Sequence, residues 1–257
     1  MTADPHARIQ ERLDATEAEH GVRILYACES GSRAWGFAST DSDYDVRFLY
    51  VRPPDWYLSV NVERMRDVIE YPIVDDLDIN GWDLRKALLL FRKSNPPLLE
   101  WLASPIIYRE HSPLVDELRQ LAGAYQLPLA MAFHYLSMAR NNFREFLQGE
   151  SVILKKYLYV LRPLLAIRWI KHQASPPPVE FAQLVAGTVT DASLLAAIED
   201  LLAKKRAGLE KDRAPRIAAL SDYIEAELSR LETLQISEAE RPGVELLNEY
   251  FRKAIDV

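Results

Sequence analysis

The pattern of hydrophobic and polar positions changes about 110 residues into the chain. Before that point, short apolar runs of strand type predominate, the first at 22–28 and the second at 46–51. In the second run Val46, Phe48 and Tyr50 occupy alternate positions, as one face of a strand requires. We therefore expect strands in this part of the chain.

Other signals in the first part predict a hairpin and helices. The runs 67–73 and 77–82 flank an acidic turn at 74–76, and this spacing predicts antiparallel pairing. A first helix is expected to end near His20. A further helix is expected over 84–91, and the prolines within 94–97 break it before a short apolar helix.

Beyond about residue 111 the apolar residues recur at intervals of three and four. This is the period of amphipathic helices, and it predicts a helical second half in which the prolines at 176–178 form a rigid connector. We therefore predict an α+β protein with one domain at 1–110 and a helical domain at 111–257. The helical apolar positions include Leu114, Leu118, Leu121, Phe133, Leu136, Leu154, Leu158, Leu161, Leu165, Leu220, Ile224 and Leu228.

Composition narrows the class of protein. The chain has 257 residues, of which 49% are hydrophobic and 27% charged, and it contains no apolar run near the roughly 20 residues of a membrane span. The N-terminal segment is charged and lacks the apolar core of a secretory signal. We therefore expect a cytoplasmic protein with no membrane partner.

The residues that commonly bind metals restrict the kind of site. Cys28 is the single cysteine, so an internal disulfide and a Cys-x-x-Cys motif are excluded, and we expect it to be a small buried strand residue. The five histidines are scattered without the spacing of a zinc motif. Any bound metal ion is therefore expected to have oxygen ligands.

Charge is distributed unevenly along the chain. The formal net charge of −7 argues against a strongly cationic nucleic-acid binder. The stretch 140–172 nevertheless holds seven basic residues against two acidic ones. One face of the helical half is therefore expected to be cationic.

The most informative motif lies between the first two expected strands. Gly31 begins a Gly-Ser turn, and Asp43 and Asp45 follow two positions apart at the start of the second strand, so both carboxylates leave the same face. Asp78 lies between apolar residues in a later strand that could pair nearby. Three such acids can hold two Mg²⁺ ions for phosphoryl chemistry.

Other motif classes do not fit these residues. A calcium-binding loop starting at Asp41 would need glycine at its sixth position and glutamate at its twelfth, where this chain has Val46 and Arg52. No Gly-Lys-Ser/Thr follows for a P-loop, and no Gly-x-Gly-x-x-Gly is present for a dinucleotide.

The order of these motifs resembles the DNA polymerase β-like nucleotidyltransferase superfamily. A strand leads to Gly-Ser, about ten residues lead to Asp-x-Asp, and an isolated Asp follows in a later strand. More specifically, the chain is similar to the YcgL/RlaP group, described as predicted nucleotidyltransferases associated with RNA repair. The likeness spans roughly residues 22 to 172 and rests on the segments 31–37, 41–47, 78–86, 93–96, 100–102 and 155–164.

The resemblance implies a mixed sheet in the first domain and a role for each motif residue. Gly31 and Ser32 would bind the β- and γ-phosphates of a nucleoside triphosphate such as ATP. Asp43 and Asp45 would bridge two Mg²⁺ ions, for which Mn²⁺ is an expected substitute, and Asp78 would hold the first ion. The implied reaction transfers NMP to a hydroxyl and releases pyrophosphate.

The rest of the nucleotide site is expected partly in the helical half. Lys155 and Lys156 begin a helix whose third residue is Tyr157, so a cation could meet phosphate while a ring stacks on a base or ribose. The remaining expected nucleotide contacts are Arg33, Ser94 and Asn95.

Each of these positions also has an ordinary structural interpretation. A Lys-Lys pair is usually a solvated face, a tyrosine in a helix is usually core or rim, and Ser94 with Asn95 fits a helix terminus. Arg47 fits a surface ion pair beside the acidic cluster.

Three hypotheses for the acceptor remain open. An RNA 3′ end agrees with the family association and with the cationic stretch 140–172. Transfer to a protein side chain or a small molecule agrees with the acidic overall charge. A nucleotide-binding regulatory protein without turnover is the third, and the intact trio Asp43, Asp45 and Asp78 argues against it.

Overall fold

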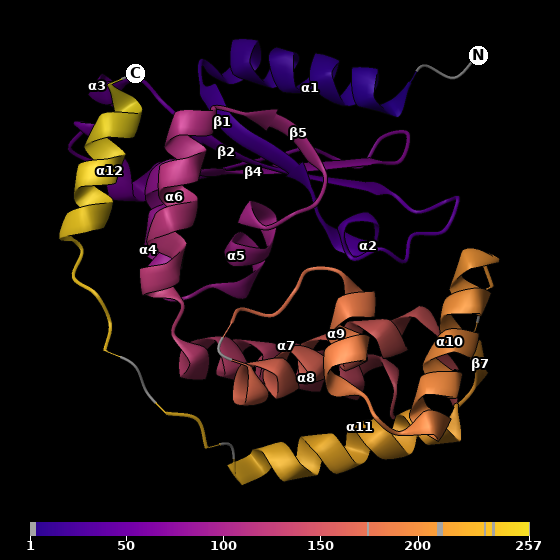
Figure 1. Ribbon diagram of the computed structural model, residues 1–257. Coiled ribbons are helices and arrows are strands. Elements are labelled where there is room, and N and C mark those ends of the chain that lie inside the picture. The colour runs from indigo at the N-terminus through magenta and orange to yellow at the C-terminus, as the bar shows by residue number, and fades with distance from the viewer. Residues whose placement is uncertain (1–3, 174, 210–212, 234, 238–239, 257) are drawn as a thin grey trace. The chain divides into compact units, whose positions relative to one another are not determined.

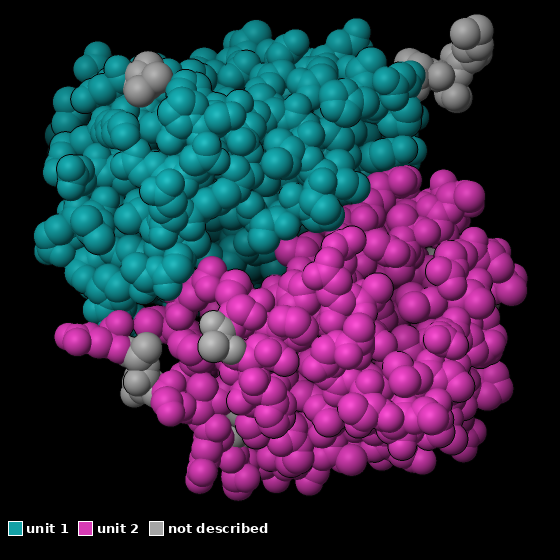
Figure 2. All heavy atoms as spheres, viewed as in Figure 1, with its two compact units in different colours: residues 1–31, 43–125, 241–257 teal, residues 32–42, 126–240 magenta. Residues whose placement is uncertain are grey.

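The computed structural model describes residues 4–173, 175–209, 213–233, 235–237 and 240–256. The chain forms two compact units (Figure 2), and each draws on separate stretches of sequence. Unit 1 comprises residues 1–31, 43–125 and 241–257, and unit 2 comprises residues 32–42 and 126–240.

Unit 1 is built on a mixed five-stranded sheet (Figure 1). Its strand order is β3-β4-β2-β1-β5, in which only β2 and β4 run parallel among these neighbours. The mixed sheet and the α+β class predicted from the sequence are confirmed. The strands are β1 (Arg23–Glu29), β2 (Tyr44–Val51), β3 (Val68–Glu70), β4 (Leu77–Asp83) and β5 (Ile107–Glu110).

Helix α1 (Pro5–His20) covers one face of this sheet. Asp4 caps its first turn by accepting a hydrogen bond from the His6 backbone N–H, and Gly21 ends it with φ 59°. The apolar side of α1 packs against alternate residues of the strands, and this gives unit 1 its main core. That core contains Ile9, Leu13, Val22, Ile24, Ala27, Val46, Phe48, Tyr50, Ile69 and Ile79.

The other helices of unit 1 contact the sheet without joining that core cluster. Trp82 of β4 packs on Trp101 of α5, with ring centroids 4.1 Å apart, so Trp82 and its alternate neighbours face away from α1. Cys28 is fully buried in β1, as predicted, and burial raises the pKa of its thiol to about 12. These helices are α4 (Leu84–Phe91), α5 (Pro96–Leu102), α6 (Ser112–Tyr125) and α12 (Glu245–Ile255), with the short α3 (Pro54–Tyr57) and η1 (Val62–Arg64) between strands.

The predicted elements of unit 1 agree closely with the structure. The first helix ends at His20, the runs 67–73 and 77–82 contain the antiparallel pair β3 and β4, and the helix expected at 84–91 is α4. The sequence did not predict β5. Only four residues form this strand at the edge of the sheet, and two of them are the charged Arg109 and Glu110, so no apolar alternation marks it.

Unit 2 is mostly helical, as the periodicity predicts. Helix α8 (Lys155–His172) has buried residues on all sides from Tyr157 to Ile167, which is the pattern of a central helix. A small antiparallel pair, β6 (Ser151–Ile153) with β7 (Arg213–Pro215), was not predicted, because three-residue strands carry no periodic signal. The other elements are α2 (Gly31–Ala34, shared with unit 1 at Gly31), α7 (Pro128–Phe146), α9 (Phe181–Thr188), α10 (Ala192–Arg206), α11 (Ala218–Arg230) and η2 (Leu231–Thr233).

The boundaries of the compact units differ from the predicted domain boundary at 110/111. Helices α6 and α12 belong to unit 1, and the loop 32–42 belongs to unit 2 although it connects two strands of the sheet. Periodicity could not show this, because it reports the type of an element and not its packing partners. No helix among the described residues has both the length and the apolar character needed to cross a membrane.

Gly81 provides a test of the packing between β2 and β4. It pairs with Phe48 across the parallel strands, and a Cβ at this position would overlap the Phe48 ring. We expect Gly81→Ala to lower the free energy of unfolding by about 1–3 kcal/mol, as overpacking does. Gly123→Ala in the exposed part of α6 meets no atom within 4 Å and should instead raise stability by up to about 1 kcal/mol. Chemical denaturation of both variants measures the difference, and equal stability would contradict this packing.

Candidate active site

Two aspartates face each other across the parallel strands of unit 1. Asp45 of β2 and Asp78 of β4 are paired positions in the sheet register. Because Val46 and Ile79 belong to the core under α1, the alternation of a strand directs Asp45 and Asp78 to the opposite face. The antiparallel pair β3 and β4 brings the chain back beside β2, so the Asp45 and Asp78 carboxylates become neighbours on one face of the sheet.

Arg47 holds this pair of like charges together. Its Nη2 lies 3.2 Å from Oδ1 of Asp45 and 2.8 Å from Oδ2 of Asp78. Its Nη1 also donates to the backbone carbonyls of Val46 and Asp78, at 3.0 and 2.8 Å. The Arg47 side chain is 18% exposed, so the ion pair predicted for Arg47 is mostly buried and joins two acids.

Gly31 lies against Asp45 where β1 gives way to α2. Its φ is 59°, a conformation that glycine adopts easily, and a Cβ at this position would overlap the Asp45 carboxylate. The backbone N–H of Ser30 donates to the Asp45 carbonyl at 2.8 Å. A glycine at position 31 is therefore a steric requirement of the carboxylate site.

Glu29 is a second acid beside Asp45 that the sequence analysis did not select. It is fully buried at the end of β1, and its Oε1 accepts the Asp45 backbone N–H at 2.8 Å. Tyr108 of β5 donates its hydroxyl to Oε2 of the same carboxylate. The sequence signal for Glu29 was an ionisable residue at the end of an otherwise apolar strand. In the structure, the Glu29 carboxylate fixes the start of β2 through the Asp45 backbone N–H.

The electrostatic environment raises the pKa of Asp45 to about 6. Burial is the largest cause, because it penalises the charged form of the carboxyl. The Arg47 charge lowers the pKa, whereas Asp78 and Asp43 raise it through like charge. Asp45 is thus a carboxyl that would ionise more readily beside an additional cation.

The predicted third acid, Asp43, is exposed just before β2 and acts on Asp45 electrostatically. Among the described residues, no group of three or more His, Cys, Asp or Glu side chains is arranged to hold a metal ion. Carboxylate oxygens are nevertheless the donors that Mg²⁺ and Mn²⁺ prefer, and Arg47 shows that one cation already bonds both Asp45 and Asp78. The pair therefore fits a divalent ion in its chemistry.

The predicted contacts at 94 and 95 have structural roles in unit 1. Ser94 is completely buried, with φ 55°, and its hydroxyl donates to the Tyr125 carbonyl. Asn95 is the N-cap of α5 and accepts from the Leu98 N–H at 3.2 Å. Both residues form the corner between α4 and α5, which agrees with the helix terminus given above as their ordinary structural interpretation.

In unit 2, Ser32 and Arg33 belong to the segment 32–42, which is stabilised by hydrogen bonds within the unit. Ser32 is buried, and Arg33 donates through Nη2 to the Ser42 carbonyl at 2.6 Å. Trp35 of the same loop accepts the Phe181 N–H at its carbonyl, and its ring lies under the Arg162 guanidinium at 4.5 Å. Arg33 therefore closes the loop, with its predicted phosphate contact untested.

The residues at the start of α8 divide into two groups. Lys156 lies 3.8 Å from the Phe146 ring, and burial together with Lys155 lowers the pKa of its ammonium. Tyr157 is completely buried, and its hydroxyl accepts the Ile217 N–H at 3.1 Å and bonds Ser221 at 2.7 Å. Tyr157 is therefore a core residue whose hydroxyl is used within unit 2.

Comparison with known proteins identifies the family. A family model described as "RlaP: RNA repair pathway DNA polymerase beta family" matches residues 6–253. The chain belongs to this RlaP family. It is also 51% identical over 224 residues to "Uncharacterized protein YcgL" of Bacillus subtilis (strain 168), covering 87% of this chain and 85% of that protein.

A solved nucleotidyltransferase-like protein from Exiguobacterium sibiricum 255-15 shows a weaker similarity. It is 15% identical, with a TM-score of 0.31, over 97% of this chain and 80% of that one, and this level carries no argument. The RlaP assignment confirms the predicted resemblance, and membership of a DNA polymerase beta family supports a nucleotidyl transfer activity.

The raised pKa of Asp45 leads to a test on the metal-free RlaP-family protein. The folded pKa of about 6 exceeds the ordinary 3.8, so the protonated carboxyl stabilises the fold at low pH and this contribution is lost as the pH rises through 6. We expect Asp45→Asn to exceed the wild type in unfolding free energy by about 1–3 kcal/mol at pH 8 and by little at pH 4. Urea denaturation across this range measures it.

The same variant tests whether the carboxylate pair takes a divalent ion. Adding Mg²⁺ at pH 8 should stabilise the wild type and should have much less effect on Asp45→Asn, because a ligand that binds the folded state raises its stability. A stability difference that does not vary between pH 4 and pH 8 would contradict the burial of Asp45.

Proposed function

We propose that this protein transfers NMP from a nucleoside triphosphate, such as ATP, to the 3′ hydroxyl of an RNA and releases pyrophosphate, with Mg²⁺ as its cofactor. The observation that supports this most directly is the matched position of Asp45 and Asp78 on parallel strands, beside a glycine that leaves room for them. Membership of the RlaP family supports the transfer chemistry in general.

In this proposal each acidic residue has a defined task. Bound Mg²⁺ would neutralise phosphate charge and favour ionisation of the attacking hydroxyl. Asp45 and Asp78 would hold the ion through their carboxylates, and Asp43 would contribute negative charge from the segment before β2. Arg47 keeps the two carboxylates oriented before an ion arrives.

The phosphates are assigned to backbone and cationic groups. Lys155 and Lys156 begin α8, where no acidic side chain occupies the first turn and no side chain caps the N–H groups. A helix N-terminus of this composition favours an anion. We include Gly31, Ser32 and Arg33 as phosphate contacts on the family pattern, and we leave out Ser94, Asn95 and Tyr157 because their polar groups are used in the fold.

RNA is preferred as the acceptor for two reasons. The family description names an RNA repair pathway, and the cationic stretch 140–172 falls mainly on α7 and α8. Arg162 of this stretch is buried under Trp35, so it is not counted as an RNA contact. Apart from Lys155 and Lys156, which are assigned to the phosphates, the exposed or half-buried basic residues of the stretch are Arg140, Arg144, Arg168 and Lys171.

A comparison of neighbouring aspartates tests the carboxylate assignment. Asp78→Asn should reduce Mg²⁺-dependent NMP transfer by at least about 100-fold, because a charge that stabilises the transition state is removed. Nucleotide affinity should change little. The measurement uses an α-³²P-labelled triphosphate with an RNA acceptor, and Asp43→Ala and Asp45→Ala should show comparable losses.

The matched control is Asp76→Asn, two positions earlier. Asp76 lies in the turn before β4, with φ 64°, and pairs with Arg8 on the surface. It should retain wild-type transfer activity. Equal losses from Asp76→Asn and Asp78→Asn would show that the wrong carboxylate had been chosen, and wild-type activity in the Asp45 variant would exclude the metal site.

The cationic residues of unit 2 give a second test. Lys156→Ala should weaken triphosphate binding by about 1.5–3 kcal/mol, the value of a hydrogen bond to a charged group. Alanine variants of Arg140, Arg144, Arg168 and Lys171 should leave this affinity unchanged. Each of them should instead flatten the salt dependence of RNA binding by roughly one unit of slope, because each removes one cation that neutralises an RNA phosphate.

Titrations of nucleotide and of RNA at several salt concentrations separate the two groups of variants. If RNA binding by the wild type does not depend on salt while transfer activity is intact, the acceptor is a protein side chain or a small molecule. If nucleotide binds and no acceptor is ever labelled, the protein is a nucleotide-binding regulator.

A further inference from the structure

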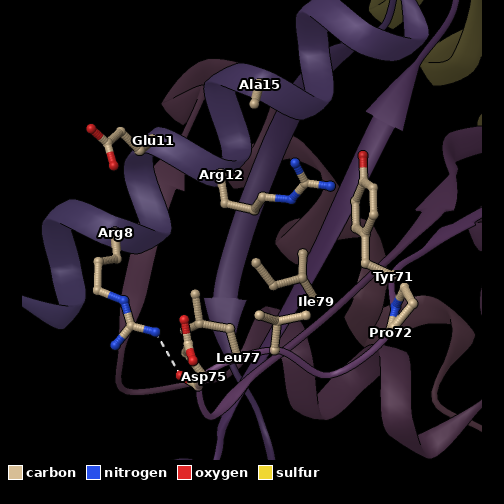
Figure 3. A pocket seen from close by; sticks show the side chains of 10 residues that line it. Arg8, Glu11, Arg12, Ala15, Tyr71, Pro72, Asp75, Leu77 and Ile79 are labelled. Atoms are coloured by element: carbon tan, nitrogen blue, oxygen red, sulfur yellow. Dashed lines mark hydrogen bonds between the residues drawn. The ribbon is translucent and has the colours of Figure 1, made fainter.

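A pocket of about 620 Å³ lies in unit 1 between α1 and the hairpin that leads into β4 (Figure 3). Its lining comes from α1, from the segment after β3, and from Leu77 and Ile79 of β4. These two residues flank Asp78 in sequence, and they face the opposite side of the sheet from it. The pocket is therefore separate from the carboxylate pair, and its volume is that of a small-molecule site.

The floor and mouth of the pocket are apolar. Leu77 and Ile79 form the floor, and Ala15, Pro72 and Val74 contribute to the walls. Val74 is 62% exposed at the mouth, next to the 60% exposed Ile73. Exposed apolar side chains beside a hollow with an apolar lining are typical of a site that binds an apolar group.

An aromatic and cationic platform forms one wall. The Arg12 guanidinium lies 3.8 Å from the centroid of the Tyr71 ring. Glu19 accepts hydrogen bonds from Arg12 at 3.1 Å and from the Tyr71 hydroxyl at 3.0 Å, so it fixes the two side chains in this arrangement. A flat surface of this type suits a planar ring, through stacking on the ring or on the guanidinium.

Arg8 lies one helical turn before Arg12 and lines the same pocket. Its Nη2 bonds the Asp75 carbonyl and the Asp76 carboxylate, which leaves other donors of this five-donor group for a ligand. The acidic partners of Arg8 and Arg12, Asp76 and Glu19, are about half exposed and do not line the pocket, so neither acid occupies the space of a ligand.

Two acidic residues, Glu11 and Asp75, also line the pocket and must be weighed against the arginines. The Glu11 side chain points away from Arg12 and Tyr71, whereas Asp75 lies near Arg8 at the rim (Figure 3). Arg12 therefore points into the pocket toward Tyr71, whereas Arg8 lies at the end of the pocket where Asp75 also lies.

We propose that this pocket binds a small amphipathic anion: a planar ring system that lies between the Arg12–Tyr71 platform and the Leu77–Ile79 floor, and that carries one anionic oxygen group held by Arg8. The ligand contacts the immediate neighbours of Asp78 from the other face of β4. The site is independent of the proposed transfer reaction, because it shares no residue with the acids that would hold the metal.

Two fluorescent probes of equal ring size test the class of ligand. The anion 8-anilinonaphthalene-1-sulfonate should bind the full-length protein at one saturable site, at least tenfold more tightly than the neutral N-phenyl-1-naphthylamine. Methyl signals of Leu77 and Ile79, observed by NMR of the ¹³C-methyl-labelled protein, should shift on addition of the sulfonate. Arg8→Ala should remove the preference for the anion and retain weak binding of both probes, whereas Arg12→Ala should weaken the binding of both probes, because it removes part of the stacking platform.

Ala15→Phe should fill the pocket and abolish binding of both probes, with circular dichroism confirming that the variant is folded. Arg66→Ala is the matched control, because Arg66 is an exposed arginine of unit 1 paired with Glu70 and lies outside the pocket. The proposal is overturned if the two probes bind equally well, if Arg8→Ala keeps the preference for the anion, if Arg12→Ala binds both probes as tightly as the wild type, or if the Leu77 and Ile79 methyl signals do not move.

Discussion

The parallel pairing of β2 and β4 forces two carboxylates into one place on the sheet, and much of unit 1 follows from that constraint. Asp45 and Asp78 are matched in register, so their repulsion cannot be relieved by sliding one strand without turning every core residue of that strand to the wrong face. The repulsion must be balanced locally. Arg47 does this, two positions along the same strand, where the alternation of side chains returns it to the same face.

The surroundings of Asp45 show how a strained electrostatic position is kept in place. Glu29, itself buried, holds the Asp45 backbone N–H, and the Ser30 N–H holds the Asp45 carbonyl, so the start of β2 is fixed on both sides of the residue. Gly31 then leaves space for the carboxylate where any side chain would overlap it. Burial raises the pKa of the Asp45 carboxyl, because the charged form lacks a full set of neutralising partners. An added cation would stabilise that charged form.

The sequence predicted the elements of this site better than it predicted contacts between them. Alternation of apolar residues located β2, and apolar flanks located Asp78 in a strand, because both depend on a period of two residues that is visible in the chain. Nothing in that pattern could show that Arg47 bridges the acids, since the bridge depends on the register between strands distant in sequence. The sequence could not place Tyr157 in the core for a related reason: a helix with buried residues on all sides has no periodic pattern that marks a solvent face, so a core tyrosine looks like a rim tyrosine.

The alternation that makes the carboxylate pair also makes β4 a strand with two different faces. Asp78 and Trp82 lie on the side of α5, whereas Leu77 and Ile79 lie on the side of α1. Both faces share one backbone, so the apolar packing of Ile79 under α1 also fixes the position from which Asp78 projects beside Asp45. The arginines of α1 and the acids of the sheet thus lie on opposite faces of the same strand, and the core residues of that strand determine which face each group meets.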